Sequence, residues 1–174
     1  MNRGALFTVP NTVSLSRLVL AFAFVLVTDT RDRAALIIAA GVTDFLDGWI
    51  ARHGNSQSAT GALIDPFADR VFVLAAVSAY LVHGIFSTTQ FFIFLARDIM
   101  TAVGFLVAKL VPRLKPVEFK ARMMGKIVTV LQLATLLLVL VVPQYTGILV
   151  WTVGILSVAA IVDYTLALWR ARAA

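Results

Sequence analysis

Residues 44–69 read DFLDGWIARHGNSQSATGALIDPFAD, and this stretch gathers four carboxylates in a chain that is otherwise poor in charge. Asp44 and Asp47 are three residues apart, and Asp65 and Asp69 are four apart. Each pair therefore shares one face of a helix. Both pairs lie in or beside apolar segments, where an ionised side chain is costly unless it is paired, hydrated or bound to an ion. Four acids under this constraint indicate a functional cluster.

The composition around this stretch indicates a membrane protein. Of 174 residues, 60% are hydrophobic and 14% are charged, whereas a soluble domain has about half apolar and about a quarter charged residues. The length predicts one domain, residues 1–174. The chain has no cysteine, which excludes disulfides and thiolate metal sites. The net charge is +6, and the basic residues lie between apolar segments. We therefore expect lipid headgroups or a phosphate-bearing substrate as partners, and no nucleic acid.

Six apolar segments predict an all-α integral membrane protein with six transmembrane helices. Most of the segments approach the roughly 20 residues that cross a bilayer. Lys and Arg are concentrated beside one set of segment ends, so the positive-inside rule places both termini in the cytoplasm. The predicted spans are 13–28, 34–51, 62–82, 91–111, 127–142 and 146–169.

The residues that share a helix face with the acids indicate what the cluster binds. Gly48 and Arg52 follow Asp44 by one and two helical turns, and Gly61 precedes Asp65 by one turn. Small residues allow a second helix or a ligand to approach closely. A short polar loop joins the two segments, so we expect the four acids to converge near the cytoplasmic end. Two divalent ions about 4 Å apart would neutralise them and could hold a diphosphate, with Arg52 on a phosphate oxygen. This predicts metal-assisted phosphoryl or phosphodiester chemistry at a membrane surface.

Two other interpretations of the acids stay open from the residues alone. An intramembrane Asp can simply bond a neighbouring helix, although four on two adjacent segments are hard to explain in this way. The acids could also line the path of an ion channel or a proton-coupled transporter. Carriers tend to have repeated halves with broken helices, and this chain shows neither clearly.

The same stretch resembles a family signature. It matches D-x2-D-G-x2-A-R-x8-G-x3-D-x3-D at every one of its eight fixed positions, and this pattern is typical of CDP-alcohol phosphatidyltransferases. The resemblance implies six transmembrane helices, a homodimer, and two metal ions, commonly Mg²⁺, with Mn²⁺ also suitable. It implies that Asp44, Asp47, Asp65 and Asp69 hold the metals, and that Asp69 is also the general base.

The resemblance also implies where the nucleotide binds. Residues 10–17, PNTVSLSR, are similar to a second family motif, P-N-x-x-[ST]-x-x-R, at the start of the first helix. By this resemblance two residues of the motif contact the cytidine, and four residues between the acids lie at the nucleotide or its diphosphate. These nucleotide-binding candidates are Asn11, Ser14, Gly48, Arg52, Ser58 and Gly61.

The reaction implied by the resemblance transfers a phosphatidyl group from CDP-diacylglycerol to an alcohol and releases CMP. The basic stretch 113–122 and the Gly125-Lys126 pair after it have two interpretations: a positive-inside loop on anionic lipid, or a pocket for a phosphate-bearing acceptor with Arg122 and Lys126. Four segments, 10–17, 63–66, 97–100 and 125–132, resemble the phosphatidylglycerol-phosphate synthase and eukaryotic-type cardiolipin synthase branches of the family, and RDIM at 97–100 and RLKP at 113–116 favour the cardiolipin branch. The acceptor is therefore expected to be phosphatidylglycerol or glycerol 3-phosphate. Arg97 and Asp98 themselves could serve packing or bind a headgroup. We expect a bacterial-type inner or plasma membrane, with the active site facing the cytoplasm.

Overall fold

A computed structural model describes residues 9–53, 61–110 and 123–173, and these residues are helical apart from short connections. Side chains are described for residues 15–46, 68–104, 106 and 124–166. This part of the chain contains no strand, which confirms the all-α prediction. The elements are α1 (Val9–Leu26), α2 (Thr30–His53), α3 (Gly61–Val82), α4 (Thr88–Leu110), α5 (Met123–Val141), the short 3-10 helix η2 (Pro143–Tyr145) and α6 (Thr146–Ala173).

Each predicted span overlaps one α-helix, but several helices begin earlier than hydropathy indicates. Helix α2 begins at Thr30 because Asp29 accepts hydrogen bonds from the backbone N–H groups of Arg31 (2.8 Å) and Asp32 (3.3 Å). Helix α4 begins with a capping box, in which Ser87 N–H donates to Gln90 Oε1 (2.8 Å) and Gln90 N–H donates to Ser87 Oγ (3.3 Å). Polar caps extend a helix beyond its apolar residues, so apolar patterning underestimates its length.

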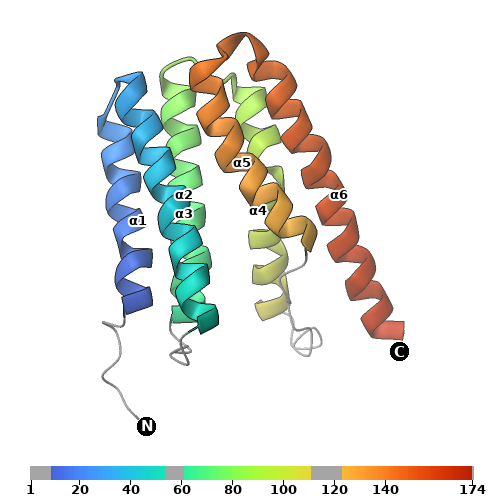
Figure 1. Ribbon diagram of the computed structural model, residues 1–174. Helices are drawn as coiled ribbons and strands as arrows, with labels where there is room; N and C mark the ends of the chain where they lie inside the picture. Colours follow the sequence, from blue (N-terminus) through green and yellow to red (C-terminus); the bar gives the residue numbers. More distant parts are fainter. Residues whose placement is uncertain (1–8, 54–60, 111–122, 174) are drawn as a thin grey trace. The chain divides into compact units, whose positions relative to one another are not determined.

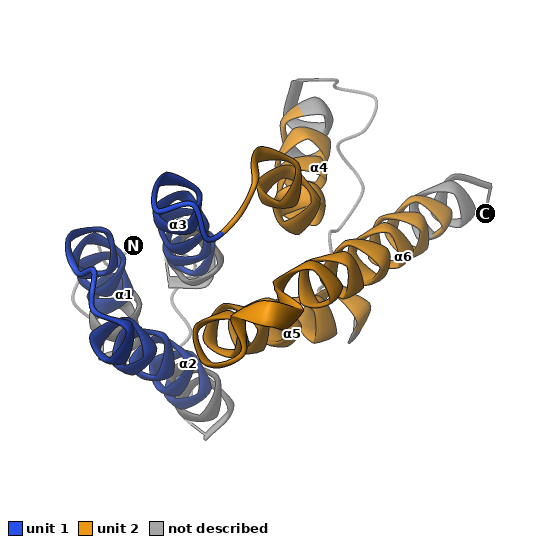
Figure 2. Cartoon of the chain, turned by 90° about the horizontal axis from the view of Figure 1, so that it is seen from above, with its two compact units in different colours: residues 1–85 blue, residues 86–174 orange. Residues whose placement is uncertain are grey.

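The described helices form two compact units, residues 1–85 and 86–174, which Figure 2 shows in blue and orange. In the first unit α1, α2 and α3 run alternately in opposite directions, and α1 packs against both of the others (Figure 1). The Phe24 ring of α1 lies 5.9 Å from the Phe72 ring and 5.8 Å from the Tyr80 ring of α3, centroid to centroid. This aromatic core fixes α1 on α3. The prediction that residues 1–174 form a single catalytic domain stays a prediction.

The other end of the aromatic core carries a buried arginine, Arg33, in the first turn of α2. Its Nε donates to the Val27 carbonyl (2.8 Å), and its Nη2 lies 3.2 Å from Nδ1 of the His83 ring. The guanidinium also stands over the Phe24 and Tyr80 rings, at 5.5 and 5.9 Å from their centroids. A backbone carbonyl, an imidazole ring and two aromatic faces therefore hold this cation where the three helices meet.

In the second unit α6 packs against both α4 and α5. Buried apolar side chains from all three helices fill the space between them, among them Phe94, Val128, Leu136, Val150 and Val153. The Phe86 and Phe94 rings lie 5.6 Å apart, centroid to centroid. Close approach is possible at Gly154 of α6, where an added Cβ would meet the Ile93 side chain of α4.

Two stretches of the described residues are long and apolar enough to cross a membrane: Met124–Val141, and Pro143–Leu166. Only 28% of each stretch is buried, which is little for the core helix of a soluble protein. Leu15–Leu26 is a shorter apolar stretch. These two stretches come from the described residues alone, and the six predicted crossings stay a prediction.

Candidate active site

A buried arginine of α1 brings together acids from the two neighbouring helices. The Arg17 side chain is 2% exposed, and its Nη1 lies 3.4 Å from Asp44 Oδ1 of α2. The same Nη1 forms an ion pair with Asp69 Oδ1 of α3. One nitrogen thus bridges two carboxylates that are far apart in the sequence, and three helices contribute to this cluster.

The fold explains why these three side chains meet. Arg17 lies in the N-terminal half of α1, Asp44 in the C-terminal half of α2 and Asp69 in the N-terminal half of α3. Because consecutive helices run in opposite directions, these halves lie at the same end of the first unit (Figure 1). Both α2 and α3 pack on α1, so the acids converge on a side chain of the helix that contacts both. We call Arg17, Asp44 and Asp69 the acidic site.

The acidic site is open on its carboxylate side. The side chains of Asp44 and Asp69 are 48% and 29% exposed, although the arginine between them is buried. Two carboxylates that can contact one cation and remain accessible are suitable ligands for hard divalent ions such as Mg²⁺ and Mn²⁺. The residues that are described therefore fit the metal chemistry that the sequence predicts.

The remaining predicted metal ligands lie on the same two helices. Asp47 is one turn beyond Asp44 in α2, and Asp65 is one turn before Asp69 in α3. Their side chains are outside the described part of the chain, and within that part no group of three or more His, Cys, Asp or Glu side chains forms a metal site. The roles assigned to all four acids stay predictions.

The predicted nucleotide and acceptor residues are placed less completely. Asn11 and Ser14 belong to α1, Gly48 and Arg52 to α2, and Gly61 to α3, but their side chains are not among those described. Ser58 and Arg122 lie outside the described residues. Lys126 is exposed in the first turn of α5.

Sequence reasoning missed Arg17 as a site residue and used it only as the last letter of a motif. A signal was present, because Arg17 is the only charged residue among the 18 of α1. A lone arginine in an apolar helix needs a partner of opposite charge or water. Four acids on the next two segments were the available partners.

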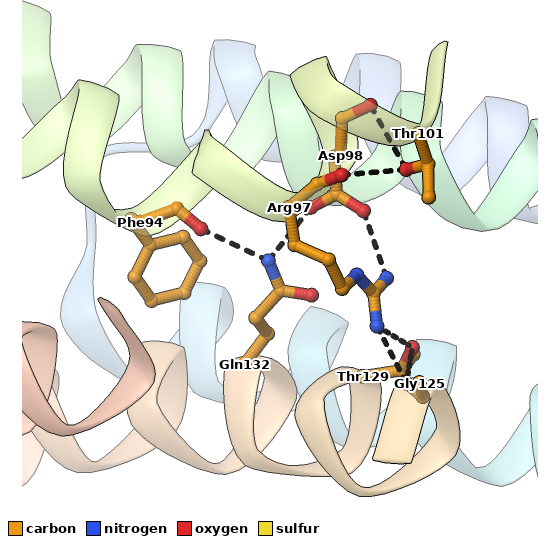
Figure 3. A network of polar contacts seen from close by, with 7 residues as sticks. All are labelled: Phe94, Arg97, Asp98, Thr101, Gly125, Thr129 and Gln132. Carbon is orange, nitrogen blue, oxygen red and sulfur yellow. Dashed lines mark hydrogen bonds and ion pairs between the residues drawn. The ribbon is translucent and has the colours of Figure 1, made fainter. Parts of the chain in front are cut away.

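A second polar cluster joins α4 and α5 in the other unit (Figure 3). Arg97 Nη2 donates to Asp98 Oδ1 (2.8 Å), and Arg97 Nη1 donates to the Gly125 carbonyl (2.5 Å) and to Thr129 Oγ1 (3.1 Å). Gln132 Nε2 donates to the second oxygen of Asp98 (2.7 Å) and to the Phe94 carbonyl (3.1 Å). The Arg97 and Asp98 side chains are only 8% and 14% exposed.

This α4–α5 cluster answers the question that the sequence left open about Arg97 and Asp98. Both oxygens of the Asp98 carboxylate accept hydrogen bonds, and the arginine is committed to the first turns of α5. The pair therefore serves packing between helices. On its far side, Gly125 approaches α6 so closely that an added Cβ would lie 2.7 Å from the Tyr164 hydroxyl oxygen. The turn that carries Lys126 is held by both neighbouring helices.

Comparison with known proteins identifies the family to which the chain is similar. The family model of CDP-alcohol phosphatidyltransferases matches residues 7–162. A CDP-diacylglycerol–glycerol-3-phosphate 3-phosphatidyltransferase of Aquifex aeolicus is 36% identical over 104 residues, which are 55% of this chain and 57% of that protein. A CMP-forming cardiolipin synthase of Streptomyces coelicolor is 34% identical over 105 residues, 55% of this chain and 49% of that protein.

The human CMP-forming cardiolipin synthase is 31% identical over 98 residues, 54% of this chain and 33% of the human protein. The matched regions thus span about half or less of two of these relatives and somewhat more of the Aquifex protein. The family match, in contrast, covers most of this chain and includes α1, the acid-bearing helices and most of α6. The chain belongs to the CDP-alcohol phosphatidyltransferase family.

Proposed function

We propose that this protein transfers a phosphatidyl group from CDP-diacylglycerol to an alcohol and releases CMP, with divalent metal ions bound at the acidic site. The observation that carries the proposal is the convergence of Asp44 and Asp69, from two different helices, on one buried cation. Family membership supplies the reaction class, and the names of the relatives supply the candidate substrates.

The metal ligands in this proposal are Asp44, Asp47, Asp65 and Asp69. Two Mg²⁺ ions bound there would neutralise the charge of the diphosphate and of the departing CMP. The helical spacing supports this assignment, because Asp47 and Asp65 each lie within one turn of an acid that the structure places at Arg17.

Asp69 is the proposed general base. Its carboxylate takes the proton of the acceptor hydroxyl, whose oxygen forms a bond to the lipid-side phosphorus of the diphosphate. The bond from this phosphorus to the oxygen of CMP breaks, and CMP leaves with the electron pair. An accessible carboxylate, 29% exposed, can reach a hydroxyl at the membrane surface, and positioning of the two reactants supplies much of the rate.

The acceptor in this proposal is phosphatidylglycerol or glycerol 3-phosphate, both of which carry a phosphate. Arg122 and Lys126 are the candidates to bind that phosphate. The exposure of Lys126 supports the assignment, because its ammonium group is accessible to an anion, and the contacts of Gly125 fix the backbone beside it. Nucleotide contacts are proposed for Asn11, Ser14, Gly48, Arg52, Ser58 and Gly61.

The six α-helices of the described residues are proposed to be six membrane spans, with the acidic site facing the cytoplasm of a bacterial-type membrane. Their lengths of 18 to 28 residues support this, because 18 residues of helix extend about 27 Å and the hydrocarbon core is about 30 Å thick. A homodimer, implied by the family resemblance, belongs to the same proposal.

The test uses the purified protein in vesicles with CDP-diacylglycerol and Mg²⁺, and measures CMP and new phospholipid. Parallel reactions supply glycerol 3-phosphate, phosphatidylglycerol, inositol phosphate or serine, and EDTA replaces Mg²⁺ in a further set. Magnesium-dependent CMP release with one phosphate-bearing acceptor supports the proposal. The absence of CMP with every acceptor, together with ion flux across the vesicles, would refute it in favour of a transporter.

A further inference from the structure

We propose that Arg17 is a resident counter-cation of the acidic site: its guanidinium neutralises Asp44 and Asp69 when no divalent ion is bound, and competes with metal for their oxygens. The inference rests on the proposed function, because it assumes that these acids bind metal. In this proposal Arg17 keeps the two acids together when metal is absent and determines how tightly metal binds.

The contact geometry supports direct competition. Arg17 Nη1 contacts Oδ1 of both Asp44 and Asp69, so a metal ion held by these two acids would share their negative charge with the guanidinium. A carboxylate oxygen that is committed to a guanidinium is a poorer ligand for a second cation, so one cation must weaken the binding of the other. Removal of the guanidinium is therefore expected to strengthen metal binding.

Burial shows why the arginine is suited to remain in place. Arg17 is 2% exposed and the two acids are 48% and 29% exposed, so the arginine neutralises them from the protein side and leaves their outer side accessible. A metal ion can approach from the open side. In the metal-free protein the arginine prevents two nearby carboxylates from repelling each other without compensation.

Arg33 supplies an internal comparison. It is as buried as Arg17, at 2%, and lies in the same unit, yet the Val27 carbonyl, the His83 ring and two aromatic faces hold it. A buried arginine between these helices therefore does not need a carboxylate partner. The pairing of Arg17 with two acids is a specific property of the acidic site, and not a general requirement of a buried arginine in this fold.

The experiment compares Mn²⁺ binding and thermal stability for the wild type, Arg17→Gln, Arg17→Lys and Arg33→Gln in detergent. Mn²⁺ binding is followed by electron paramagnetic resonance, and unfolding is measured in EDTA and at saturating Mn²⁺. Arg33→Gln is the matched control, because Arg33 is about 16 Å along α2 from Asp44 at 1.5 Å per residue. No substrate is present, so the result does not depend on activity.

For Arg17→Gln we expect Mn²⁺ to bind roughly 5- to 150-fold more tightly than to the wild type, the usual range for coupling between two sites. In EDTA this variant should unfold at a lower temperature than the wild type, and saturating Mn²⁺ should remove most of the difference. Arg17→Lys keeps the positive charge on a shorter side chain, so its Mn²⁺ affinity and its unfolding temperature in EDTA should lie between those of the wild type and Arg17→Gln. Arg33→Gln should bind Mn²⁺ like the wild type.

Unchanged or weaker Mn²⁺ binding by Arg17→Gln would overturn the inference, since Arg17 would then support the acids and not compete for them. If Arg17→Gln cannot be obtained folded, Arg17→Lys decides: a loss of stability in EDTA that Mn²⁺ does not recover also overturns it. A wild type that binds no Mn²⁺ would refute the metal dependence of the proposed function, and the competition with it.

Discussion

Replacement of Arg97 with methionine tests the packing role of the α4–α5 cluster. The substitution keeps an apolar stem of similar length and removes the hydrogen bonds to the Gly125 carbonyl, Thr129 Oγ1 and Asp98 Oδ1. The Asp98 carboxylate, 14% exposed, would retain only its bond from Gln132. Removing one partner of a buried ion pair costs about 3–5 kcal/mol, and we expect a loss of this size in the free energy of unfolding.

The second half of this test is a double-mutant cycle with Asp98→Asn. Alone, this substitution leaves the buried Arg97 cation without its negative partner and replaces one of the two accepting oxygens of Asp98 with an NH2 group, so it should also cost about 3–5 kcal/mol. In the double variant no unpaired carboxylate remains buried, so its cost should fall about 1–3 kcal/mol below the sum of the two single costs. Unfolding by increasing fractions of SDS in mixed micelles, followed by tryptophan fluorescence, measures all four proteins.

Additive costs in this cycle would refute the reasoning, because they would mean that Arg97 and Asp98 do not stabilise each other. A small cost for Arg97→Met, within about 0.5 kcal/mol of zero as for an ordinary surface change, would do the same and would favour headgroup binding. Because the α4–α5 cluster does not include the acidic site, folded Arg97→Met should bind Mn²⁺ with the affinity of the wild type.

Three further predictions follow from individual contacts. Asp69→Asn should lower the rate of CMP release by about 10²- to 10⁴-fold, the usual contribution of a general base. The control is Asp32→Asn, which changes an exposed acid in the first turn of α2 and should leave this rate unchanged; equal rates for the two variants would refute the base assignment. Gly125→Ala should cost about 1–3 kcal/mol of stability, because the added methyl group would overlap the Tyr164 hydroxyl. In a chemical-unfolding assay Tyr164→Phe should recover part of this loss when it is combined with Gly125→Ala, and should not stabilise the protein on its own. Ser87→Ala should cost about 1 kcal/mol by removing one half of the capping box, and unchanged stability would count against that cap.

The sequence predicted the helices well because apolar patterning reports burial or lipid contact directly. It misjudged their ends where a polar residue caps a helix: Asp29 and the pair Ser87 and Gln90 extend α2 and α4 into stretches that looked like loops. It also treated Arg33 as part of a loop, although the aromatic faces of Phe24 and Tyr80 bury it inside the first unit. Such contacts depend on partners that are distant in the sequence.

The sequence predicted that Asp44 and Asp69 come together, but it did not predict that Arg17 lies between them. The acids could be predicted as metal ligands because carboxylates in apolar segments need a counter-ion and because their spacing matches the family motif. The contact of both acids with Arg17 depends on how α2 and α3 pack on α1, and local periodicity contains no information about packing partners. We expected the acids of two neighbouring segments to converge, and for Asp44 and Asp69 a third helix supplies the group that joins them.

Both polar clusters contain a buried arginine, but they differ in how exposed the acids beside it are. In the α4–α5 cluster the Asp98 side chain is 14% exposed and both its oxygens accept hydrogen bonds from protein groups, so the carboxylate is little accessible to a ligand. In the acidic site the arginine is equally enclosed, but Asp44 and Asp69 are exposed enough to bind a second partner. This exposure supports the proposal that Asp44 and Asp69 bind a further cation.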